Sequence, residues 1–282
     1  MKKRKSATPD PVKYQRPFLK YPGCKHQLLD LIFATLPGGD RLIEPFAGSC
    51  VVGLNAMKYG HVWANDINPD LIGLYDQVRN PEFVPLCRSL FTPERNREGV
   101  YYTMRGQFNG GYLKAMDRAA FFVYFNRHCY NGLCRYNADG GFNVPFGSYD
   151  DPRFPCAEIM AFQKFAERAT FTCLDWKAVM DQAIAGDVVY ADPPYVPISD
   201  TANFTAYAGT TFGDKEAKEL NEKAVELSKR GIPVVISNSN IERTLALFCG
   251  ATRTVELTAR RSISRDATTR GQAKEVMLVY QA

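Results

Sequence analysis

The stretch Asp187-Val188-Val189-Tyr190-Ala191-Asp192-Pro193-Pro194-Tyr195 decides how the rest of the chain is interpreted. Residues 187–191 are mostly apolar and predict a buried strand. The two prolines end this strand, because proline cannot donate a hydrogen bond to a sheet ladder. Asp192 is therefore expected at the carboxyl end of a central strand. Ligands bind at that edge of open α/β sheets, so the sequence predicts an α/β fold with a functional site at Asp192.

The tetrapeptide 192–195 suits alkylation of an amine attached to an aromatic ring. Such an amine is a weak nucleophile because its lone pair is delocalised into the ring, and two rigid hydrogen-bond acceptors favour its reactive, pyramidal form. The Asp192 carboxylate and the Pro193 carbonyl are acceptors of this kind. Tyr195 offers a flat face on which a purine can stack. An ordinary Pro-Pro turn explains these residues equally well, so a cofactor site elsewhere must decide between the two interpretations.

Composition and charge indicate a globular protein with an affinity for polyanions. The 282 residues are 45% hydrophobic and 23% charged, which fits one large domain with an insertion, or two domains. The net charge of +5 is unevenly distributed and includes a basic arm at 1–5 and an arginine cluster at 260–270. No segment has the length and apolarity of a membrane span, and the arm does not lead into the apolar core of a signal peptide. We therefore expect a cytoplasmic protein with no membrane partner.

Cysteine and histidine positions do not indicate a metal site. The eight cysteines include no Cys-x-x-Cys pair, and the three histidines are not clustered with them. We expect free thiols, as in a reducing compartment, and no bound metal.

A nucleotide-binding pattern lies nearer the N-terminus. Residues 41–57 predict a strand, a turn of small residues and a helix, and 61–65 predict a second strand that ends at Asp66, 18 positions beyond Gly48. In the first βαβ unit of a nucleotide-binding sheet, the turn admits the ligand and the acid accepts hydrogen bonds from ribose hydroxyls. Residues 48–53 lack the middle glycine of Gly-x-Gly-x-x-Gly. S-adenosylmethionine, which brings adenosine without phosphate, therefore fits better than a dinucleotide.

A separate module is predicted at 76–150, because the roughly 140 residues between the two sites exceed what an open sheet needs. Residues 117–129 have helical spacing, and turn chemistry at 137–141 predicts a hairpin. Arginines, asparagines and tyrosines interleave at 124–137. Arg can read guanine, Asn can read adenine, and aromatic rings can fill the space of a displaced base. The alternative, that these side chains hold a small domain together, stays open for most of the tyrosines.

The chain after the tetrapeptide completes the sheet. Residues 201–207 form a polar, aromatic segment that either closes over the substrate or simply connects two elements. Residues 214–230 predict a helix with an apolar inner and a charged outer side. Arg260-Arg261-Ser262 suits phosphate contact, with a solvated loop as the alternative. The other predicted elements are a helix at 28–36 and strands at 232–237, 255–257 and 276–280.

Several motifs together resemble those of the Dam-type DNA adenine-N6 methyltransferases of the D12 class, in the alpha-type motif order. They are FLKYPGCK at 18–25, EPFAGS at 44–49, DIN at 66–68, YNGLCRYN at 130–137, FNVPFG at 142–147, DPPY at 192–195 and RRSIS at 260–264. The resemblance covers nearly the whole chain. It implies a Rossmann-like S-adenosylmethionine-dependent methyltransferase fold with a mostly parallel, seven-stranded sheet and an inserted helical and hairpin DNA-recognition domain. The expected division is a basic arm at 1–15, a catalytic domain at 16–75 and 151–282, and a target-recognition domain at 76–150.

The resemblance also implies roles for individual residues. The catalytic residues are Asp192, Pro193, Pro194 and Tyr195. The cofactor residues are Tyr21, Lys25, Asp66 and Asp192 in contact, with Phe46 and Gly48 shaping the pocket. The DNA-contacting residues are Lys20, Tyr130, Asn131, Leu133, Arg135 and Pro145, with Arg260, Arg261 and Ser262 on phosphates. Two positions depart from the family pattern, because cysteine stands at 24 and at 50 where glycine is usual.

The implied function is methyl transfer from S-adenosylmethionine to N6 of adenine in double-stranded DNA, within GATC, with the adenine flipped out of the helix. One alternative is a methyltransferase acting on cytosine N4 or on RNA. Another is an inactive DNA-binding protein that retains the fold, against which the intact 192–195 motif argues. The sequence leaves open the oligomeric state and the existence of a restriction partner.

Overall fold

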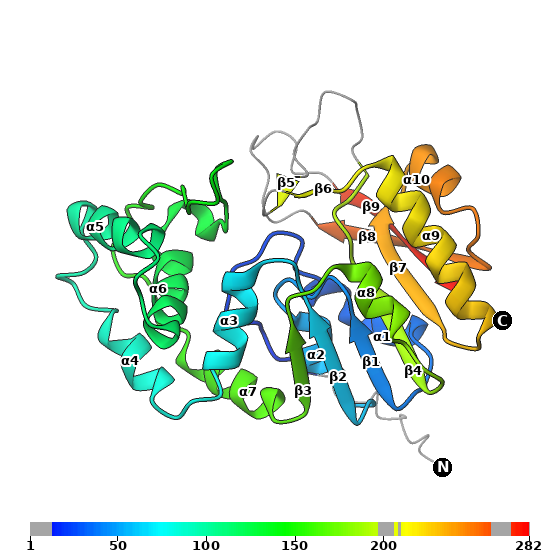
Figure 1. Cartoon of the computed structure of the whole chain (residues 1–282), viewed down its shortest axis with the longest axis horizontal. Coiled ribbons are helices and arrows are strands. Elements are labelled where there is room, and N and C mark those ends of the chain that lie inside the picture. The colour runs from blue at the N-terminus through cyan, green and yellow to red at the C-terminus, as the bar shows by residue number, and fades with distance from the viewer. Residues whose placement is uncertain (1–12, 197–205, 208–209, 261–271, 282) are drawn as a thin grey trace, which may run out of the picture.

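The computed structural model describes residues 13–196, 206–207, 210–260 and 272–281. Its centre is a seven-stranded sheet, and a group of helices stands to the left of the sheet in Figure 1. Helices α3 (Pro69–Gln77) and α7 (Cys156–Ala166) lie between the two parts.

The strand order is β3-β2-β1-β4-β7-β9-β8, and the first five strands are parallel. The chain therefore winds outward from β1 to β3 and then returns to the other side of β1 with β4, which makes a topological switch point beside β1. Strand β9 is antiparallel to both of its neighbours. The prediction of a mostly parallel, seven-stranded, Rossmann-like sheet is confirmed. The strands are β1 Arg41–Glu44, β2 His61–Asn65, β3 Ala169–Thr172, β4 Asp187–Ala191, β7 Val234–Ser239, β8 Arg253–Arg260 and β9 Gln272–Tyr280.

Two hydrophobic cores lie on opposite faces of the sheet, because successive strand residues point to opposite sides. In β4, Val188 and Tyr190 join one core, while Val189 and Ala191 join the other. Every residue of β4 is buried, which explains why this strand is a continuous apolar run rather than an alternating one. The first core includes residues of α1 Leu29–Thr35, α2 Val51–Asn55, α3, α7 and the group of helices to the left in Figure 1. The second includes residues of α8 Trp176–Asp181, α9 Asp214–Lys229 and α10 Glu242–Leu247.

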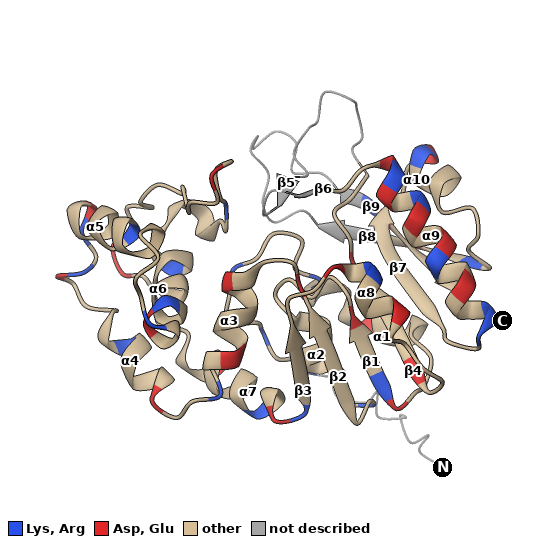
Figure 2. Ribbon diagram, viewed as in Figure 1, with Lys and Arg blue, Asp and Glu red and all other residues tan. Residues whose placement is uncertain are grey.

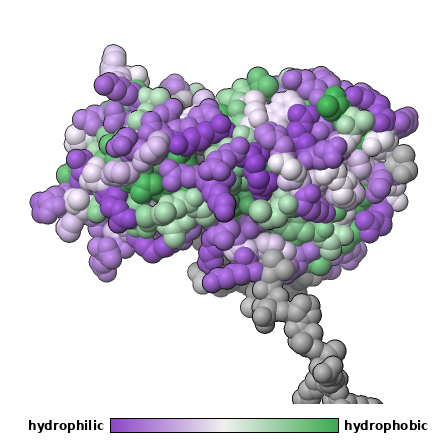
Figure 3. Space-filling view, turned by 90° about the horizontal axis from the view of Figure 1, so that it is seen from below, coloured by the Kyte–Doolittle hydropathy of each residue, from purple (hydrophilic) through white to green (hydrophobic). Residues whose placement is uncertain are grey.

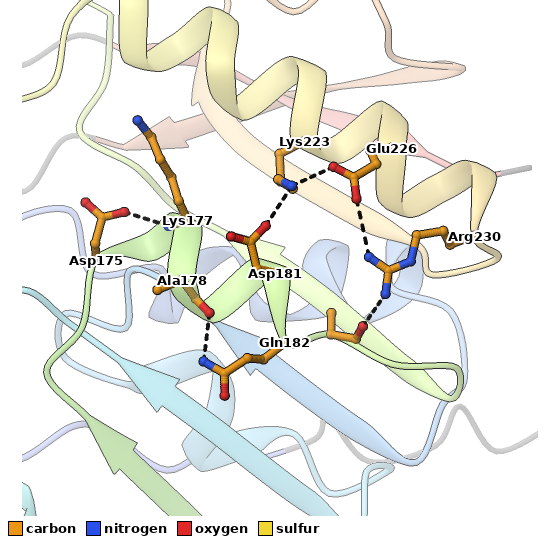
Figure 4. A network of polar contacts seen from close by, with 9 residues as sticks. Asp175, Lys177, Ala178, Asp181, Gln182, Lys223, Glu226 and Arg230 are labelled. Carbon is orange, nitrogen blue, oxygen red and sulfur yellow. Dashed lines mark hydrogen bonds and ion pairs between the residues drawn. The ribbon is translucent and has the colours of Figure 1, made fainter.

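Helix α9 has the two-sided character that the sequence predicts, with its charged residues on the outside (Figure 2). Figure 4 shows how it is joined to α8. Lys223 Nζ lies 2.7 Å from Asp181 Oδ1 and 2.5 Å from Glu226 Oε2, and Arg230 donates to the Ala183 carbonyl at 2.7 Å. Ion pairs this exposed contribute about 0–1 kcal/mol each to stability. We therefore interpret the network as a structural contact between α8 and α9 and not as a functional site.

The helical group comprises α4 (Phe83–Ser89), α5 (Glu98–Asn109), α6 (Ala115–His128) and the 3-10 turn η2 (Tyr130–Gly132), so the helix predicted at 117–129 is confirmed. Its buried aromatic residues belong to the same core as α1 and α2. The Tyr124 hydroxyl donates to the Arg95 carbonyl, which confirms the structural interpretation for this tyrosine, and the Tyr101 hydroxyl of α5 donates to the Val144 carbonyl. The domain boundary at 76 stays a prediction, and it falls within the last turn of α3.

The predicted hairpin is present as a turn with a single bridge. Tyr136 pairs with Phe142, and Asn137 closes the turn by accepting the Gly141 N–H on its side chain at 2.7 Å. Regular strands do not extend from it, because side chains such as Asn109 take the neighbouring backbone groups of Phe142. The remaining elements are η1 His26–Leu28 and a two-stranded sheet of β5 Ala206–Tyr207 and β6 Thr210–Thr211.

Hydrophilic residues cover most of the face in Figure 3, with hydrophobic residues interspersed, as is usual for globular proteins. Within the described ranges, no helix is long and apolar enough to cross a bilayer. All eight cysteines are free. The described part of the chain also contains no group of three or more His, Cys, Asp or Glu residues that could hold a metal ion.

Candidate active site

The loops that follow β1, β2 and β4 meet at the carboxyl edge of the sheet, beside the switch point. The loop after β1 is held against the end of β2, because Ala47 N donates to the Asn65 carbonyl at 2.7 Å and Gly48 N donates to Asp66 Oδ2 at 2.9 Å. The predicted pairing of a small-residue turn with an acid after the second strand is therefore present in the structure.

The turn at Gly48 leaves no room for a larger residue. Gly48 has a φ of 47°, and a Cβ placed there would lie 3.1 Å from the Tyr21 ring. The Tyr75 hydroxyl donates to the Gly48 carbonyl at 2.5 Å and fixes the peptide plane. Cys50, which replaces a glycine of the family pattern, also has a left-handed φ of 55°. Its buried thiol contacts Glu44 Oε2 at 3.7 Å, so this departure is accommodated inside the core.

Asp66 is held by its neighbours before any ligand arrives. Its Oδ2 accepts from Gly48 N, and its Oδ1 accepts from Asn68 N at 3.0 Å. Burial raises the pKa of the Asp66 carboxyl, while these backbone N–H groups act in the opposite direction. Each carboxylate oxygen can accept more than one hydrogen bond, so Asp66 retains acceptor capacity toward a ligand.

Two exposed apolar side chains flank Asp66, and the sequence did not single them out. Ile67 is 41% exposed and Leu174 is 40% exposed. The Leu174 backbone is bound in both directions by the Asn65 side chain at 2.9 Å, and Cys173 Sγ donates to the Ile67 carbonyl at 3.5 Å. The sequence signal that could have identified them is an apolar residue two positions after the end of β2 and another two positions after the end of its neighbour β3.

The catalytic motif gathers around a buried lysine. Lys25 Nζ lies 3.0 Å from Asp192 Oδ2, donates to the Gly23 carbonyl at 3.0 Å, and sits 4.7 Å from the centroid of the Tyr195 ring. The Tyr195 hydroxyl donates to Glu275 Oε2 at 2.8 Å, and the same oxygen is 3.9 Å from Lys25 Nζ. The structure thus brings Lys25, Asp192 and Tyr195 together. The sequence did not predict Glu275 as a site residue, because it only precedes the apolar run that predicts a strand at 276–280.

Asp192 has one oxygen paired and the other unpaired. Burial raises the pKa of the Asp192 carboxyl to about 6, Lys25 and the nearby Tyr195 hydroxyl oppose this rise, and Glu275 adds to it. Asp192 Oδ1 is buried and has no hydrogen-bond partner among the described residues. A buried acceptor without a partner is costly, so this atom is the best candidate to receive a hydrogen bond from a substrate.

The motif is also fixed at its far end. Val196 N donates to Asn238 Oδ1 at 3.2 Å, and Ser239 Oγ donates to the Val196 carbonyl at 3.3 Å. Asn238 and Ser239 belong to β7, the neighbour of β4. Because the prolines restrict the backbone between Asp192 and Val196, the segment is rigid along its length.

Phe46 lies half-buried between two aromatic rings. Its ring centroid is 6.0 Å from that of Trp176 and 5.9 Å from that of Phe212. Tyr21 and Phe46 therefore lie beside the turn in different surroundings. Tyr21 contacts Gly48, and Phe46 packs on the second core.

Lys20, in the segment before η1, is anchored to the helical group through its backbone. The buried Asn126 amide accepts from Lys20 N at 2.8 Å and donates to the Lys20 carbonyl at 2.7 Å and to the Gly132 carbonyl at 3.0 Å. The Lys20 side chain is exposed, with Nζ 4.9 Å from the centroid of the Tyr149 ring. Gly132 is required here, because a Cβ on it would lie 2.6 Å from Lys20 Cδ.

Three other predicted DNA contacts lie close to Lys20. Asn131 has a left-handed φ of 54°, and its N–H donates to the Tyr149 hydroxyl at 3.0 Å. Tyr130 is 54% exposed, and its N–H donates to the Pro145 carbonyl at 2.9 Å. Lys20, Tyr130, Asn131 and Pro145 therefore form one exposed group, and their contact with DNA stays a prediction.

Arg135 and Leu133 occupy the approach to the hairpin. Arg135 is exposed, and Asn143 accepts its Nε–H on Oδ1 at 2.8 Å and an N–H of Nη2 on the backbone carbonyl at 3.2 Å. Leu133 is half-buried and packs on the core. The Arg260 backbone pairs with Gln272, but its side chain, together with Arg261, Ser262 and residues 201–205, lies outside what the structure describes, so those predictions remain untested.

Comparison with known proteins identifies relatives along almost the entire length. Residues 21–263 match the family model for D12 class N6 adenine-specific DNA methyltransferases. A DNA adenine methylase of Serratia marcescens is 44% identical over 273 residues, covering 96% of this chain and all of that protein. DNA adenine methylases of Escherichia coli K12 and of Vibrio cholerae are 44% and 43% identical, covering 96% and 95% of this chain and 97% of each relative.

Proposed function

Because the chain belongs to the D12 class of N6 adenine-specific DNA methyltransferases, its reaction is methylation of adenine N6 in DNA, and we propose that S-adenosylmethionine is the methyl donor and the adenine of GATC the target. The observation that carries the catalytic part is Asp192 at the end of β4, with one oxygen on Lys25 and the other unpaired. We place the activity in the cytoplasm, where free cysteines persist.

The residues at the carboxyl edge fit S-adenosylmethionine. Asp66 is a fixed acceptor suited to ribose hydroxyls, and Ile67 and Leu174 offer exposed apolar surface to an adenine ring. Lys25 supplies a cation for the amino-acid part, and Gly48 keeps the turn open beside Tyr21. When bound, S-adenosylmethionine supplies a methyl group on a positively charged sulfur.

In the proposed mechanism the chain makes N6 a better nucleophile by accepting a hydrogen bond from each of its two N–H groups. Asp192 Oδ1 and the Pro193 carbonyl are the two acceptors, and the rigid segment from Asp192 to Val196 holds them in place. N6 gains positive charge as its new bond forms, and the Asp192 carboxylate stabilises that charge. The Tyr195 ring, held by Glu275, is the surface on which the adenine stacks after it leaves the DNA helix.

The cofactor role of Asp66 can be tested by Asp66→Ala. We expect the affinity for S-adenosylmethionine to fall by about 1.5–3 kcal/mol, because the ribose loses a charge-assisted hydrogen bond. Titration calorimetry measures this, and the unfolding midpoint shows whether the turn at Gly48 has collapsed. Asp214→Ala, which removes a surface partner of Arg243, is the matched control. Equal affinities in the wild type and Asp66→Ala would remove Asp66 from the site.

The pH dependence of kcat/KM should report Asp192. A carboxyl with a pKa of about 6 is ionised above that pH, and only the ionised form is a charged acceptor, so kcat/KM should fall as the pH drops below about 6. Lys25 holds the pKa down, so Lys25→Met should move this acid limb to higher pH. Lys177→Met, on the surface of α8, should leave it in place. A profile that is flat from pH 5 to 8 contradicts the assignment.

Reading of GATC is tested most directly at Arg135. If its guanidinium contacts guanine O6 and N7, Arg135→Ala should cost about 1–3 kcal/mol on the cognate site and relax the preference at that base pair. Asn143→Ala, which removes the side-chain partner of Arg135 Nε and leaves the backbone carbonyl of residue 143 in place, is the companion variant. Methylation rates on GATC and on duplexes altered at each position give the answer. An even loss of affinity across all sequences, with weaker salt dependence, would assign Arg135 to phosphate. A wild-type protein without a GATC preference would refute the target.

A further inference from the structure

A buried carboxylate joins the cofactor side of the molecule to the helical group. Asp70 lies in the first turn of α3, which packs beside α6 in Figure 1. Its side chain is only 8% exposed. Asp70 Oδ1 lies 2.5 Å from Arg118 Nε on α6, and Asp70 Oδ2 accepts from the Tyr136 hydroxyl at 2.7 Å. Neither the sequence motifs nor the proposed mechanism uses this residue.

The same short segment carries the candidate ribose ligand. Asn68 N donates to Asp66 Oδ1 at 3.0 Å, and Asn68 Oδ1 accepts from Asp70 N at 3.0 Å and from Leu71 N at 3.3 Å. Asp66 in turn accepts from Gly48 N on its other oxygen. Residues 66–70 are therefore bonded to the cofactor turn at one end and to the helical group at the other.

One partner of Asp70 leads to the hairpin that we assign to DNA, and the other leads to the core of the helical group. Tyr136 forms the single bridge of the hairpin with Phe142 and directly follows Arg135. Arg118 donates to the Phe108 carbonyl at 2.7 Å, and its guanidinium carbon lies 3.9 Å from the centroid of the Phe108 ring, which ties α6 to the end of α5. Because Asp70 is bonded to Tyr136, a movement of segment 66–70 must also move the Tyr136–Phe142 bridge of the hairpin.

We propose that Asp70 is a positioning residue that couples occupancy of the cofactor site to the orientation of the DNA-reading hairpin. The proposal rests on the proposed function, because it takes Asp66 as a cofactor ligand and Arg135 as a DNA contact. The coupling is reciprocal by thermodynamic necessity: a cofactor that stabilises the present arrangement of segment 66–70 favours DNA binding, and bound DNA raises the affinity for the cofactor by the same factor.

The test uses the full-length protein and S-adenosylhomocysteine, the unreactive product, so that no methylation occurs during titration. Its dissociation constant is measured by calorimetry without DNA and with a saturating GATC duplex, and the ratio of the two is the coupling. We expect a ratio of about 5-fold or more for the wild type, the lower end of typical coupling. Tyr136→Phe removes one hydroxyl and Asp70→Asn removes the charge; both should bring the ratio close to 1 while the DNA-free constant changes by less than about 2-fold.

The matched control is Tyr124→Phe. It removes a hydroxyl from the same helical group that is bound at 2.6 Å to the Arg95 carbonyl and does not cross to α3, so the wild-type ratio should persist. A wild-type ratio of 1, a normal ratio in Tyr136→Phe, or an equal loss in Tyr124→Phe each overturns the proposal. Failure of the wild type to bind S-adenosylhomocysteine overturns the proposed cofactor site as well. Normal binding with the same dissociation constant in the absence and presence of DNA overturns the coupling alone.

Discussion

Asp192→Ala is expected to lower turnover by about 10²-fold or more, because it removes an acceptor whose interaction with N6 is strongest in the transition state. The variant loses both the unpaired Oδ1 and the partner of Lys25. Single-turnover methylation of a GATC duplex measures the chemical step directly. DNA affinity should largely survive, because the predicted base contacts lie at Lys20 and between 130 and 145, and the predicted phosphate contacts lie at 260–262.

Asp192→Asn separates charge from hydrogen bonding. The amide retains one oxygen acceptor but carries no charge, so its turnover should lie between those of the wild type and Asp192→Ala. Binding of S-adenosylmethionine must be measured in both variants, because Lys25 loses its ion pair with Asp192 in each. Near-normal single-turnover rates in Asp192→Ala, with the cofactor saturating, would contradict the proposed role of this carboxylate.

The parts of the site that the sequence predicts are those set by local chain geometry. The 187–195 stretch specifies a strand and its end, because apolar residues and two prolines act within a few positions of one another. The turn at Gly48 and the acid at 66 follow from the same local logic, and the structure joins them through a hydrogen bond. The amphipathic pattern likewise predicts α9 to within one residue of its end.

The parts that the sequence does not predict depend on contacts between distant segments. Glu275 reaches Tyr195 only because β9 inserts antiparallel between β7 and β8, and no local pattern specifies that order. Asn238 meets Val196 through the pairing of β4 with β7. In the sequence, Asp70 is an ordinary acid in the first turn of a helix, a position that the helix dipole favours. Its two partners, Arg118 and Tyr136, come from distant segments, so only the folded structure identifies them.

The hairpin shows how local signals can be right in kind but not in extent. Turn chemistry at 137–141 is present, with Asn137 closing the turn. The flanking residues then bond to side chains of α5 instead of extending a ladder, as Tyr101 and Arg105 do with the Val144 carbonyl. Competition between side-chain and backbone partners is a tertiary effect, and a single sequence carries no measure of it.

Asn126→Ala is expected to have the second large effect, on stability and on DNA binding together. The Asn126 side chain is 1% exposed and bonds to both backbone groups of Lys20 and to the Gly132 carbonyl. Alanine leaves these groups without their partner, and because unsatisfied buried groups cost about 1–3 kcal/mol each, with water reaching part of this site, we expect a loss of about 3 kcal/mol. Denaturant unfolding followed by tryptophan fluorescence measures the change.

The loss of DNA affinity should exceed what destabilisation explains, because Lys20 is no longer held beside Tyr130 and Asn131. Asn221→Ala is the matched control: Asn221 accepts from Gly250 N at 3.0 Å and from the Tyr280 hydroxyl at 2.9 Å, on the opposite side of the sheet from the helical group. It should destabilise the fold while leaving DNA binding intact at temperatures where the protein is folded. Equal DNA affinities for the two variants under those conditions would show that Asn126 supports the core and does not position Lys20.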